Sequence, residues 1–395
     1  MNTETLTDLF AQRVHNVPQS FIREILKVAA NPGIVSFAGG LPNPQLFPVK
    51  ELEECAIRVF QKHGMQALQY AATEGYYPLR EYVSGRYRDR FGLNIPAEQI
   101  LITNGSQQAL DLIGKLFIQP GDNIAVERPS YLGALQSFSM FEPHFKEATL
   151  QQDGIEPDEL EQILSLYGCN LFYTIPNFQN PSGIRYSKEK RIKAAEIIKG
   201  KEVILIEDDP YGDISFTEEI LPPIYSYVPE QSILLGSFSK IIAPGLRLGW
   251  MIANKEIIKK AAIMKQASDL HSGNLSQYIL FEFLSNYNLE KHIEKLKTQY
   301  KKQRDMMVDS IEKYFPASVN YTKPEGGMFT WLTLPRGLTS RDLLKQALEK
   351  NIIFVPGDSF YASNPDTQTL RLNYSNVEGD LMKSALKILG EMIDR

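Results

Sequence analysis

A lysine near the middle of the chain lies in a setting typical of covalent catalysis. Lys240 belongs to the segment Ser-Phe-Ser-Lys-Ile-Ile-Ala-Pro-Gly-Leu-Arg-Leu-Gly, residues 237–249, which follows an apolar strand pattern. Open α/β sheets bind ligands beyond the carboxyl ends of their strands. Lysine forms imines with carbonyl compounds when its amine is held partly neutral. The hydroxyls of Ser237 and Ser239 and the guanidinium of Arg247 suit a phosphate close to that amine.

A carboxylate follows a second apolar run. Asp208 comes directly after residues 203–207, Val-Ile-Leu-Ile-Glu, and Tyr211 lies three residues further on. A semi-buried carboxylate at a strand end can keep the nitrogen of a pyridine-type ring protonated, which makes the ring an electron acceptor. Tyr211 can hydrogen-bond a phenolic oxygen of the same ring. Taken alone, the Asp-Asp-Pro sequence equally fits a turn or a helix cap.

A third motif joins a strand to a helix through a Gly-Ser turn. Residues 103–111 read Thr-Asn-Gly-Ser-Gln-Gln-Ala-Leu-Asp. The first N–H groups of such a helix are free, and the helix dipole favours an anion beside them. By itself the motif is also an ordinary helix start. Its value lies in agreeing with the other two motifs.

Three further side chains can complete a binding site. Asn180, in an Asn-Pro-Ser-Gly turn after a strand, can donate to a carboxylate or phenolate oxygen, and Tyr131, in Arg-Pro-Ser-Tyr, can stack on a flat ring. Arg371 lies in the strand pattern Thr-Leu-Arg-Leu-Asn-Tyr-Ser, opposite the leucines, and its planar fork suits a carboxylate. Each also fits a loop, a core position or an exposed strand residue.

The elements that must position these residues alternate along the chain. From about residue 98, short apolar runs alternate with helical patterns, as in a buried, mainly parallel sheet. The predicted strands are residues 100–103, 123–127, 145–149, 170–175, 203–207, 232–236 and 250–253. The connection before Trp250 is short, rich in Pro and Gly and without helical periodicity, so we expect that last strand to be antiparallel. The predicted fold class is α/β, with a seven-stranded, mostly parallel sheet covered by helices.

The pattern also predicts how the chain divides. Residues 51–289 are expected to form the large domain and residues 290–395 a smaller α+β domain. An amphipathic helix, Leu289–Tyr314, is expected to bridge the two. Residues 1–50, rich in Gly and Pro, are expected to form an extended arm and part of the small domain.

Composition excludes several classes of protein. The 395 residues carry 42 Lys plus Arg against 47 Asp plus Glu, a formal net charge of −5, which argues against a nucleic-acid surface. Only two cysteines occur, which fits a reducing compartment. The polar start resembles no signal peptide, and no apolar run approaches the roughly 18 residues that span a membrane. We therefore expect a cytoplasmic protein, without a metal site.

Together these motifs identify a family. The chain resembles, over essentially its whole length, the fold-type I pyridoxal-phosphate aminotransferases of class I/II, and within them the 2-aminoadipate, kynurenine and aromatic amino-acid branch. The resemblance implies pyridoxal 5'-phosphate as cofactor and an internal aldimine on Lys240. It places Asp208 at the ring nitrogen, Tyr211 and Asn180 at the ring oxygen, and Arg371 at the substrate carboxylate.

The resemblance implies further site residues and a partner. The cofactor phosphate is expected to contact Gly105, Ser106, Gln107, Ser237, Ser239 and Arg247, and Tyr131 is expected to stack on the ring. Tyr70 matches a tyrosine that reaches a phosphate across the interface of a homodimer with shared active sites. Gly40 and Arg23, from the arm, are expected on the substrate side, with Arg23 recognising a distal carboxylate.

The leading hypothesis is transamination between an L-amino acid, either aromatic, branched, 2-aminoadipate-like or lysine-like, and a 2-oxo acid, with 2-oxoglutarate as the expected acceptor. A second hypothesis is another pyridoxal-phosphate reaction on the same scaffold, such as C–S β-elimination, which product analysis distinguishes. A third is the ligand-sensing domain of a transcription regulator. Such regulators carry a DNA-binding domain ahead of this part, and an arm that begins by about residue 16 leaves no room for one.

Overall fold

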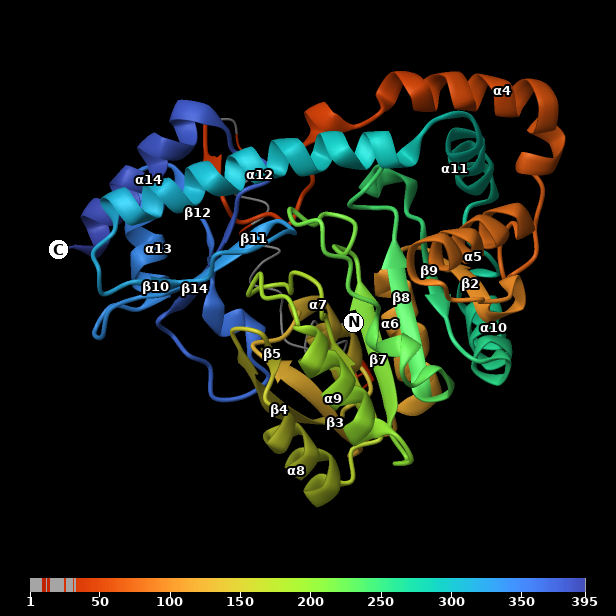
Figure 1. Cartoon of the computed structure of the whole chain (residues 1–395), viewed down its shortest axis with the longest axis horizontal. Helices are drawn as coiled ribbons and strands as arrows, with labels where there is room; N and C mark the ends of the chain where they lie inside the picture. The colour runs from red at the N-terminus through yellow and green to blue at the C-terminus, as the bar shows by residue number, and fades with distance from the viewer. Residues whose placement is uncertain (1–8, 12, 15–24, 26–30, 32, 395) are drawn as a thin grey trace.

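The computed structural model describes residues 9–11, 13, 14, 25, 31 and 33–394, arranged as a large part built on a sheet and a smaller part beside it (Figure 1). The helices are α4 (Val49–Ala67), α5 (Tyr77–Phe91), α6 (Ser106–Phe117), α7 (Leu132–Ser139), α8 (Pro157–Tyr167), α9 (Lys188–Ile198), α10 (Lys255–Asp269), α11 (Asn274–Asn286), α12 (Leu289–Tyr314), α13 (Ser340–Glu349) and α14 (Gly379–Ile393). Among these described elements, no helix combines the length and the apolar character needed to cross a bilayer.

The large sheet has eight strands. In spatial order they are β2 (Ile100–Thr103), β9 (Gly249–Ile252), β8 (Ser232–Ser237), β7 (Ile204–Asp209), β6 (Leu171–Thr174), β3 (Asn123–Arg128), β4 (His144–Gln151) and β5 (Gly154–Ile155). Strand β9 is antiparallel to both β2 and β8, as the connection without a helix predicted. The eighth strand, absent from the prediction, is β5, which forms a hairpin with β4. Its two residues are too few to show a hydrophobic pattern.

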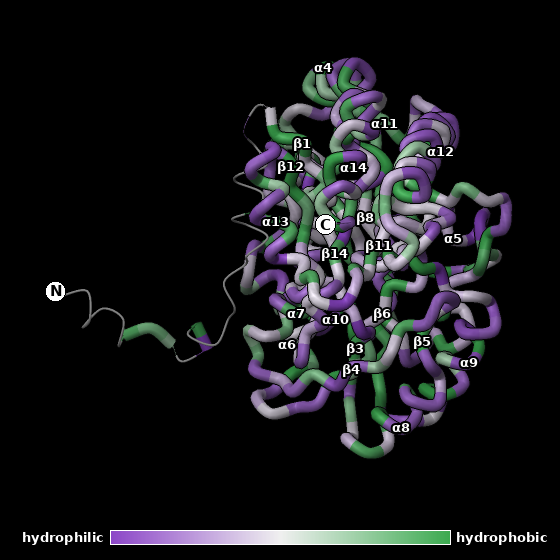
Figure 2. The backbone as a smooth tube through the Cα atoms, turned by 90° about the vertical axis from the view of Figure 1, so that its left-hand side faces the viewer, coloured by the Kyte–Doolittle hydropathy of each residue, from purple (hydrophilic) through white to green (hydrophobic). Residues whose placement is uncertain are grey.

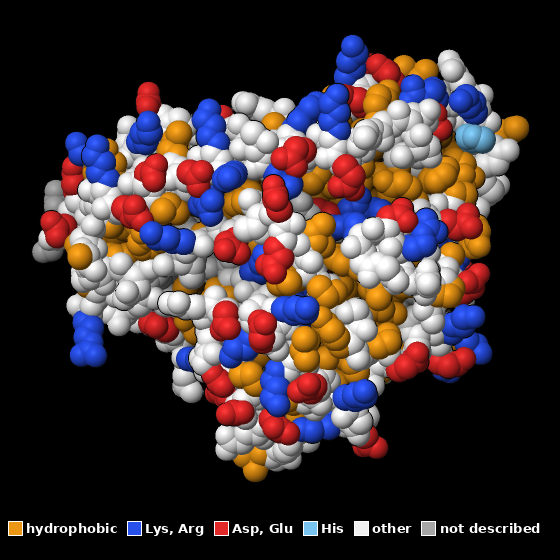
Figure 3. All heavy atoms as spheres, viewed as in Figure 1, with side chains coloured by type: hydrophobic (Ala, Val, Ile, Leu, Met, Phe, Trp, Pro, Cys, Tyr) orange, Lys and Arg blue, Asp and Glu red, His pale blue; other side chains and the backbone are white. Residues whose placement is uncertain are grey.

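Helices cover both faces of this sheet. Helices α6, α7 and α10 lie on one side of the strands, and α8 and α9 lie on the other (Figure 2). Strands β2, β6 and β8 are consequently buried along their whole length, as their nearly continuous apolar runs predicted. On the face shown in Figure 3, acidic and basic side chains are interspersed over the surface.

The smaller part is an α+β unit to which both ends of the chain contribute. Its four-stranded antiparallel sheet has the order β10 (Asn320–Tyr321), β11 (Phe329–Thr333), β14 (Thr369–Asn373) and β13 (Val355–Pro356). Near the start of the chain, β1 (Val35–Ser36) pairs in parallel with β12 (Ile352–Ile353). The long helix α12 runs between the two parts (Figure 1). The predicted fold class is confirmed, and the boundaries at residues 50 and 289 stay predictions.

Strand register brings the predicted motifs to one edge of the large sheet. Strands β3, β6, β7 and β8 are parallel, so their carboxyl ends lie at the same edge. Ser237, at the end of β8, pairs with Gly249 at the start of β9, and Gly249 in turn pairs with Thr103 at the end of β2. Loops that begin at this edge therefore carry the candidate site.

Candidate active site

A cavity of about 390 Å³ opens at this edge, between the large sheet and the smaller part. The predicted site residues in its wall are Gly40, Gly105, Ser106, Gln107, Tyr131, Asn180, Asp208, Tyr211, Ser237, Ser239, Lys240, Arg247 and Arg371. Residues far apart in the sequence are thus brought together in one place. The cavity is a single candidate site for all three motifs.

Lys240 supplies an amine with unusual acid–base properties. It lies just beyond β8, and its Nζ donates a hydrogen bond of 2.8 Å to the carbonyl oxygen of Gly40. Burial lowers the pKa of the Lys240 amine to about 8, and the positive charges of Arg371 and Arg247 act in the same direction. A larger fraction of this amine is therefore neutral near pH 7 than of an ordinary lysine, which makes it a better nucleophile toward a carbonyl carbon.

Asp208 presents a carboxylate oxygen without a partner. The residue lies near the end of β7 and is 2% exposed. Its Oδ2 accepts a hydrogen bond of 3.0 Å from the hydroxyl of Tyr173, whereas its Oδ1 is buried with no partner among the described residues. Burial raises the pKa of Asp208 to about 7, and the hydrogen bond from Tyr173 opposes that effect. A cationic N–H group bound in the cavity beside Oδ1 would stabilise the ionised form of this buried carboxyl group.

The amino end of α6 forms a pocket for an anion. Gly105 precedes the helix with φ +77°, and the Oγ of Ser106 is buried with no partner among the described residues. The side chain of Arg247 lies close to the same turn. A Cβ atom added to Gly105 would be only 3.1 Å from Nη2 of Arg247. Helical N–H groups, a free hydroxyl and a guanidinium together suit a phosphate.

The end of β8 leads into a turn that is held by a side-chain hydroxyl. The Oγ of Ser237 accepts a hydrogen bond of 3.1 Å from the backbone N–H of Ser239, which fixes the turn between them. Both residues line the cavity. On the other side, Gln107 donates from Nε2 to the carbonyl oxygen of Gly133 at 2.9 Å.

Arg371 brings a buried positive charge from the smaller part. It lies on β14, is 4% exposed, and donates from Nη1 to Oδ1 of Asn180 at 2.7 Å and from Nη2 to the carbonyl of Ala38. Its Nε has no partner among the described residues. Burial lowers the pKa of Arg371 to about 10, so the guanidinium stays charged at neutral pH. Arg371 lies in the cavity wall, and a carboxylate is the ligand that its planar fork suits.

Two tyrosines complete the walls. Tyr211 is 4% exposed, and burial raises its pKa far above its usual range although a hydrogen bond with Asn180 acts the other way. Burial likewise raises the pKa of Tyr131 to about 12. Both hydroxyls are therefore protonated at neutral pH, so Tyr211 can donate a hydrogen bond and Tyr131 can present an uncharged ring face.

Among the described residues, one predicted site residue is not in the cavity wall. Tyr70 follows α4, is 78% exposed, and makes an edge-on ring contact with His271 at 5.8 Å. Arg23 lies outside the described residues. Neither of their predicted roles is tested by this single chain.

Some residues in and around the site were not predicted from the sequence. Tyr173 faces Asp208 from the neighbouring strand β6, and Gln136 and Phe360 also line the cavity. The pairing of β6 with β7 was not evident from the pattern, because a strand pattern does not name the strand's neighbour. Phe360 comes from a short 3₁₀ turn, Gly357–Phe360, whose sequence contains no recognisable motif.

Comparison with known proteins agrees with this geometry. Residues 41–389 match the family model for aminotransferase class I and II. The chain is 41% identical over 390 residues to aromatic-amino-acid aminotransferase 1 of Thermococcus litoralis, covering 97% of this chain and 94% of that protein. It is 37% identical to the 2-aminoadipate transaminase of Thermus thermophilus, covering 98% and 97%.

A solved structure shows the same fold. The kynurenine aminotransferase of Pyrococcus horikoshii, solved with PMP, superposes with a TM-score of 0.94 at 38% identity, covering 98% of both chains. The chain belongs to the class I and II aminotransferases, and its reaction is pyridoxal-phosphate-dependent transamination.

The residues present fit this cofactor. The unpartnered Oδ1 of Asp208 suits a protonated ring nitrogen, and the unpartnered Oγ of Ser106 suits a phosphate oxygen. The amine of Lys240, with its lowered pKa, suits the cofactor's carbonyl carbon. The two buried oxygens of the cavity wall that lack a partner among the described residues are thus each complementary to one part of pyridoxal phosphate.

Proposed function

We propose that this aminotransferase moves the amino group of an aromatic, branched, 2-aminoadipate-like or lysine-like L-amino acid to 2-oxoglutarate. The single observation that carries the proposal is that the Lys240 amine, the free Asp208 oxygen and the Arg371 guanidinium line one cavity. The relatives named for aromatic amino acids and for 2-aminoadipate support those two classes of donor.

The chemistry is divided between the cofactor and the chain. When bound, pyridoxal phosphate supplies a reactive carbonyl carbon and a ring that accepts electron density from the substrate. The Nζ of Lys240 takes the proton from the substrate's α-carbon, because its lowered pKa keeps part of the amine neutral. The Oδ1 of Asp208 holds a proton at the ring nitrogen by hydrogen bonding and charge.

Asn180 links substrate and cofactor binding. Its Oδ1 accepts from Arg371 at 2.7 Å, so its Nδ2 is left as a donor toward the ring oxygen, together with the hydroxyl of Tyr211. Arg371 binds the substrate's α-carboxylate through the donors that Asn180 and Ala38 do not use. Charge-assisted bonds of this kind are about twice as strong as neutral ones, and they orient the α-carbon.

Other predicted residues are assigned to the phosphate and the ring face. Gly105, Ser106 and Gln107 present the amino end of α6, and Ser237, Ser239 and Arg247 come from the opposite side of the turn; both groups line the cavity. Tyr131 stacks on the ring, and Gly40 lies on the substrate side. Arg23 keeps its assignment to a distal carboxylate by resemblance alone.

The active form is proposed to be a homodimer. Apolar side chains at the end of α4 and just beyond it are strongly exposed: Met65 at 85%, Leu68 at 67% and Tyr70 at 78%. Exposed apolar groups gathered on one segment are typical of a covered interface. Tyr70 would then reach the partner's phosphate. We also propose a cytoplasmic location, which the two buried, unpaired cysteines support.

A donor screen tests the proposed function. Purified protein is incubated with each candidate amino acid and 2-oxoglutarate, and both glutamate and the new 2-oxo acid are measured. Equal amounts of the two products from an aromatic, branched or 2-aminoadipate donor are expected. Release of ammonia with pyruvate from a sulfur amino acid, without glutamate, would instead show β-elimination.

A further inference from the structure

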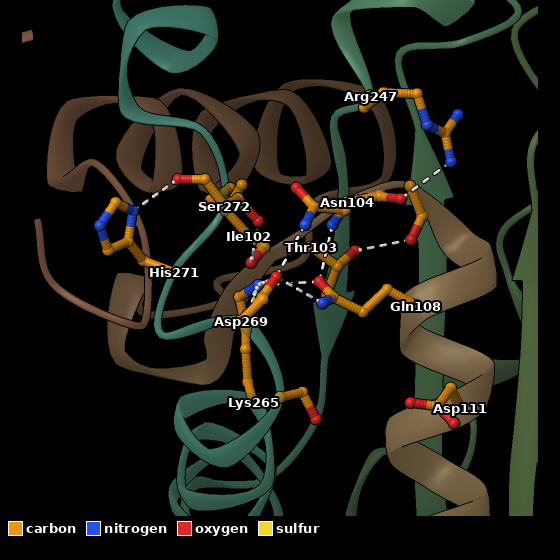
Figure 4. Close-up of polar contacts among 12 residues, drawn as sticks. Ile102, Thr103, Asn104, Gln108, Asp111, Arg247, Lys265, Asp269, His271 and Ser272 are labelled. Carbon is orange, nitrogen blue, oxygen red and sulfur yellow. Dashed lines mark hydrogen bonds and ion pairs between the residues drawn. The ribbon is translucent and has the colours of Figure 1, made fainter. Parts of the chain in front are cut away.

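A partly buried polar network lies behind the proposed phosphate pocket, away from the cavity. It joins the start of α6 to the end of α10 (Figure 4). Its centre is Gln108, the third residue of α6. The Oε1 of Gln108 accepts a hydrogen bond of 2.8 Å from the backbone N–H of Asn104, and its Nε2 donates to the carboxylate of Asp269 at 2.6 Å. Glutamine at this helix position commonly reaches back to the chain before the helix.

A buried lysine fixes the orientation of that amide. The side chain of Lys265 is 0% exposed and its Nζ lies 2.9 Å from Oδ2 of Asp269 and 2.8 Å from Oε1 of Gln108. An ammonium group removed from water is tolerated only when it is paired and hydrogen-bonded. Oε1 of Gln108 must therefore face Lys265 and the Asn104 amide, while Nε2 faces the carboxylate.

Three hydrogen bonds hold Asn104 in place, two to the network and one to Arg247. Its backbone N–H is bound by Gln108, its Nδ2 donates to Asp269 at 2.7 Å, and its carbonyl oxygen accepts from Nη2 of Arg247 at 3.0 Å. Asn104 is also the residue directly before Gly105, where the chain turns with φ +77° into the amino end of α6. A change at Gln108 is thus transmitted both to the turn and to the anchor of Arg247.

We propose that Gln108, Lys265 and Asp269 are positioning residues that preorganise the phosphate end of the cofactor site. None of the three is in the cavity wall, so they act through Asn104 and Arg247. The inference rests on the proposed placement of the phosphate at residues 105–107. It predicts that the network contributes to binding of the phosphate and leaves binding of the ring unchanged.

The test compares pyridoxal phosphate with pyridoxal, which lacks the phosphate. The full chain, freed of cofactor, is titrated with each compound and binding is followed by absorbance. Gln108→Met keeps the length of the side chain and leaves Lys265 paired with Asp269, so no buried charge is stranded. We expect about tenfold weaker binding of pyridoxal phosphate, which is the size of effect seen when a residue that orients a metal ligand is removed. The affinity for pyridoxal should stay within about twofold of the wild type.

A matched control joins the same two helices elsewhere. Lys115 bonds Asp111 on α6 at 2.6 Å and Ser268 on α10 at 2.9 Å, without reaching Asn104. Lys115→Met should leave the ratio of the two affinities unchanged. If Gln108→Met fails to fold, Gln108→Leu, which likewise leaves Lys265 paired with Asp269, is measured in its place.

The outcomes separate this inference from the proposed function. A selective loss for pyridoxal phosphate supports the positioning role. An unchanged ratio, whether both affinities fall together or neither falls, overturns it and leaves only a packing role for the network. If the wild-type chain itself binds both compounds equally, it is the placement of the phosphate that fails.

Discussion

At the scale of single residues, the site is defined by burial that leaves specific polar atoms free. Asp208 and Ser106 each keep one buried oxygen without a partner among the described residues, and Arg371 keeps its Nε. A buried polar atom without a hydrogen-bond partner destabilises the folded protein, and this cost is offset when a complementary ligand binds. Burial also raises the pKa of Asp208 and lowers that of Lys240, so both shifts favour the uncharged form.

Asp208→Asn is expected to lower kcat by about 10²–10³-fold while cofactor remains bound. The amide keeps the shape of the side chain but cannot stabilise a positive charge at the ring nitrogen. Glu207→Gln is the matched control, because Glu207 is an equally buried neighbour whose carboxylate accepts from the N–H groups of Ile224 and Tyr225 and does not line the cavity. Equal loss of turnover in both variants would contradict the assignment.

The lowered pKa of Lys240 predicts how fast cofactor-free protein captures pyridoxal phosphate at different pH values. The neutral amine is the reactive form, so the rate should rise by roughly tenfold per pH unit below the pKa and level off above it. With the pKa at about 8 instead of 10.5, the plateau should begin near pH 8. Stopped-flow absorbance between pH 7 and 10 measures this, and a rate still climbing at pH 10 would show an unshifted lysine.

At the scale of elements, the edge of the large sheet decides what the loops can do. The residues that could be predicted, such as Asp208 and Lys240, follow apolar strands whose carboxyl ends must meet. What could not be predicted depends on which elements pack together. Tyr173 reaches Asp208 only because β6 pairs with β7, and Gln108 meets Lys265 only because α10 packs on α6. Periodicity along one segment carries no information about its neighbours.

The turn into α6 is expected to tolerate no side chain. In Gly105→Ala, positive φ costs about 1 kcal/mol or more of stability, and the new Cβ would lie 3.1 Å from Nη2 of Arg247. Gly92→Ala is the control, since Gly92 has φ +70° with nothing within 4 Å of an added Cβ. Thermal unfolding should show the larger destabilisation in Gly105→Ala, because Gly105 has ψ +170°, a backbone region open essentially to glycine alone, whereas Gly92 is left-handed helical with ψ +16°. Only Gly105→Ala should weaken binding of pyridoxal phosphate. Equal cofactor affinity in the two variants would separate Gly105 from the phosphate.

At the scale of the whole molecule, the proposed site includes one residue, Tyr70, that would come from a second subunit. Tyr70 is highly exposed and lies outside the cavity wall. The proposed homodimer accounts for both facts if each subunit lends Tyr70 to the other. Sequence patterns describe what a chain buries within itself, so a residue buried only between chains is found by resemblance and not by periodicity.

Mixing inactive variants tests the shared site. Tyr70→Ala and Lys240→Ala subunits should each have little activity alone, whereas their mixed dimer contains one site with both native residues. After subunit exchange, confirmed by mass spectrometry of the intact dimer, activity should recover to about a quarter of the wild-type value: random pairing makes half of the dimers mixed, each with one of its two sites complete. Exchange without recovery would show that Tyr70 serves its own subunit or packing alone.

Covalent trapping can show directly whether the cavity holds pyridoxal phosphate on Lys240. The purified protein is reduced with borohydride, which makes the bond between the amine and the cofactor permanent, and is then digested for peptide mass spectrometry. A phosphopyridoxyl group is expected on Lys240 and on no other lysine. A modified lysine elsewhere, or an unmodified Lys240 in protein that transaminates, would contradict it.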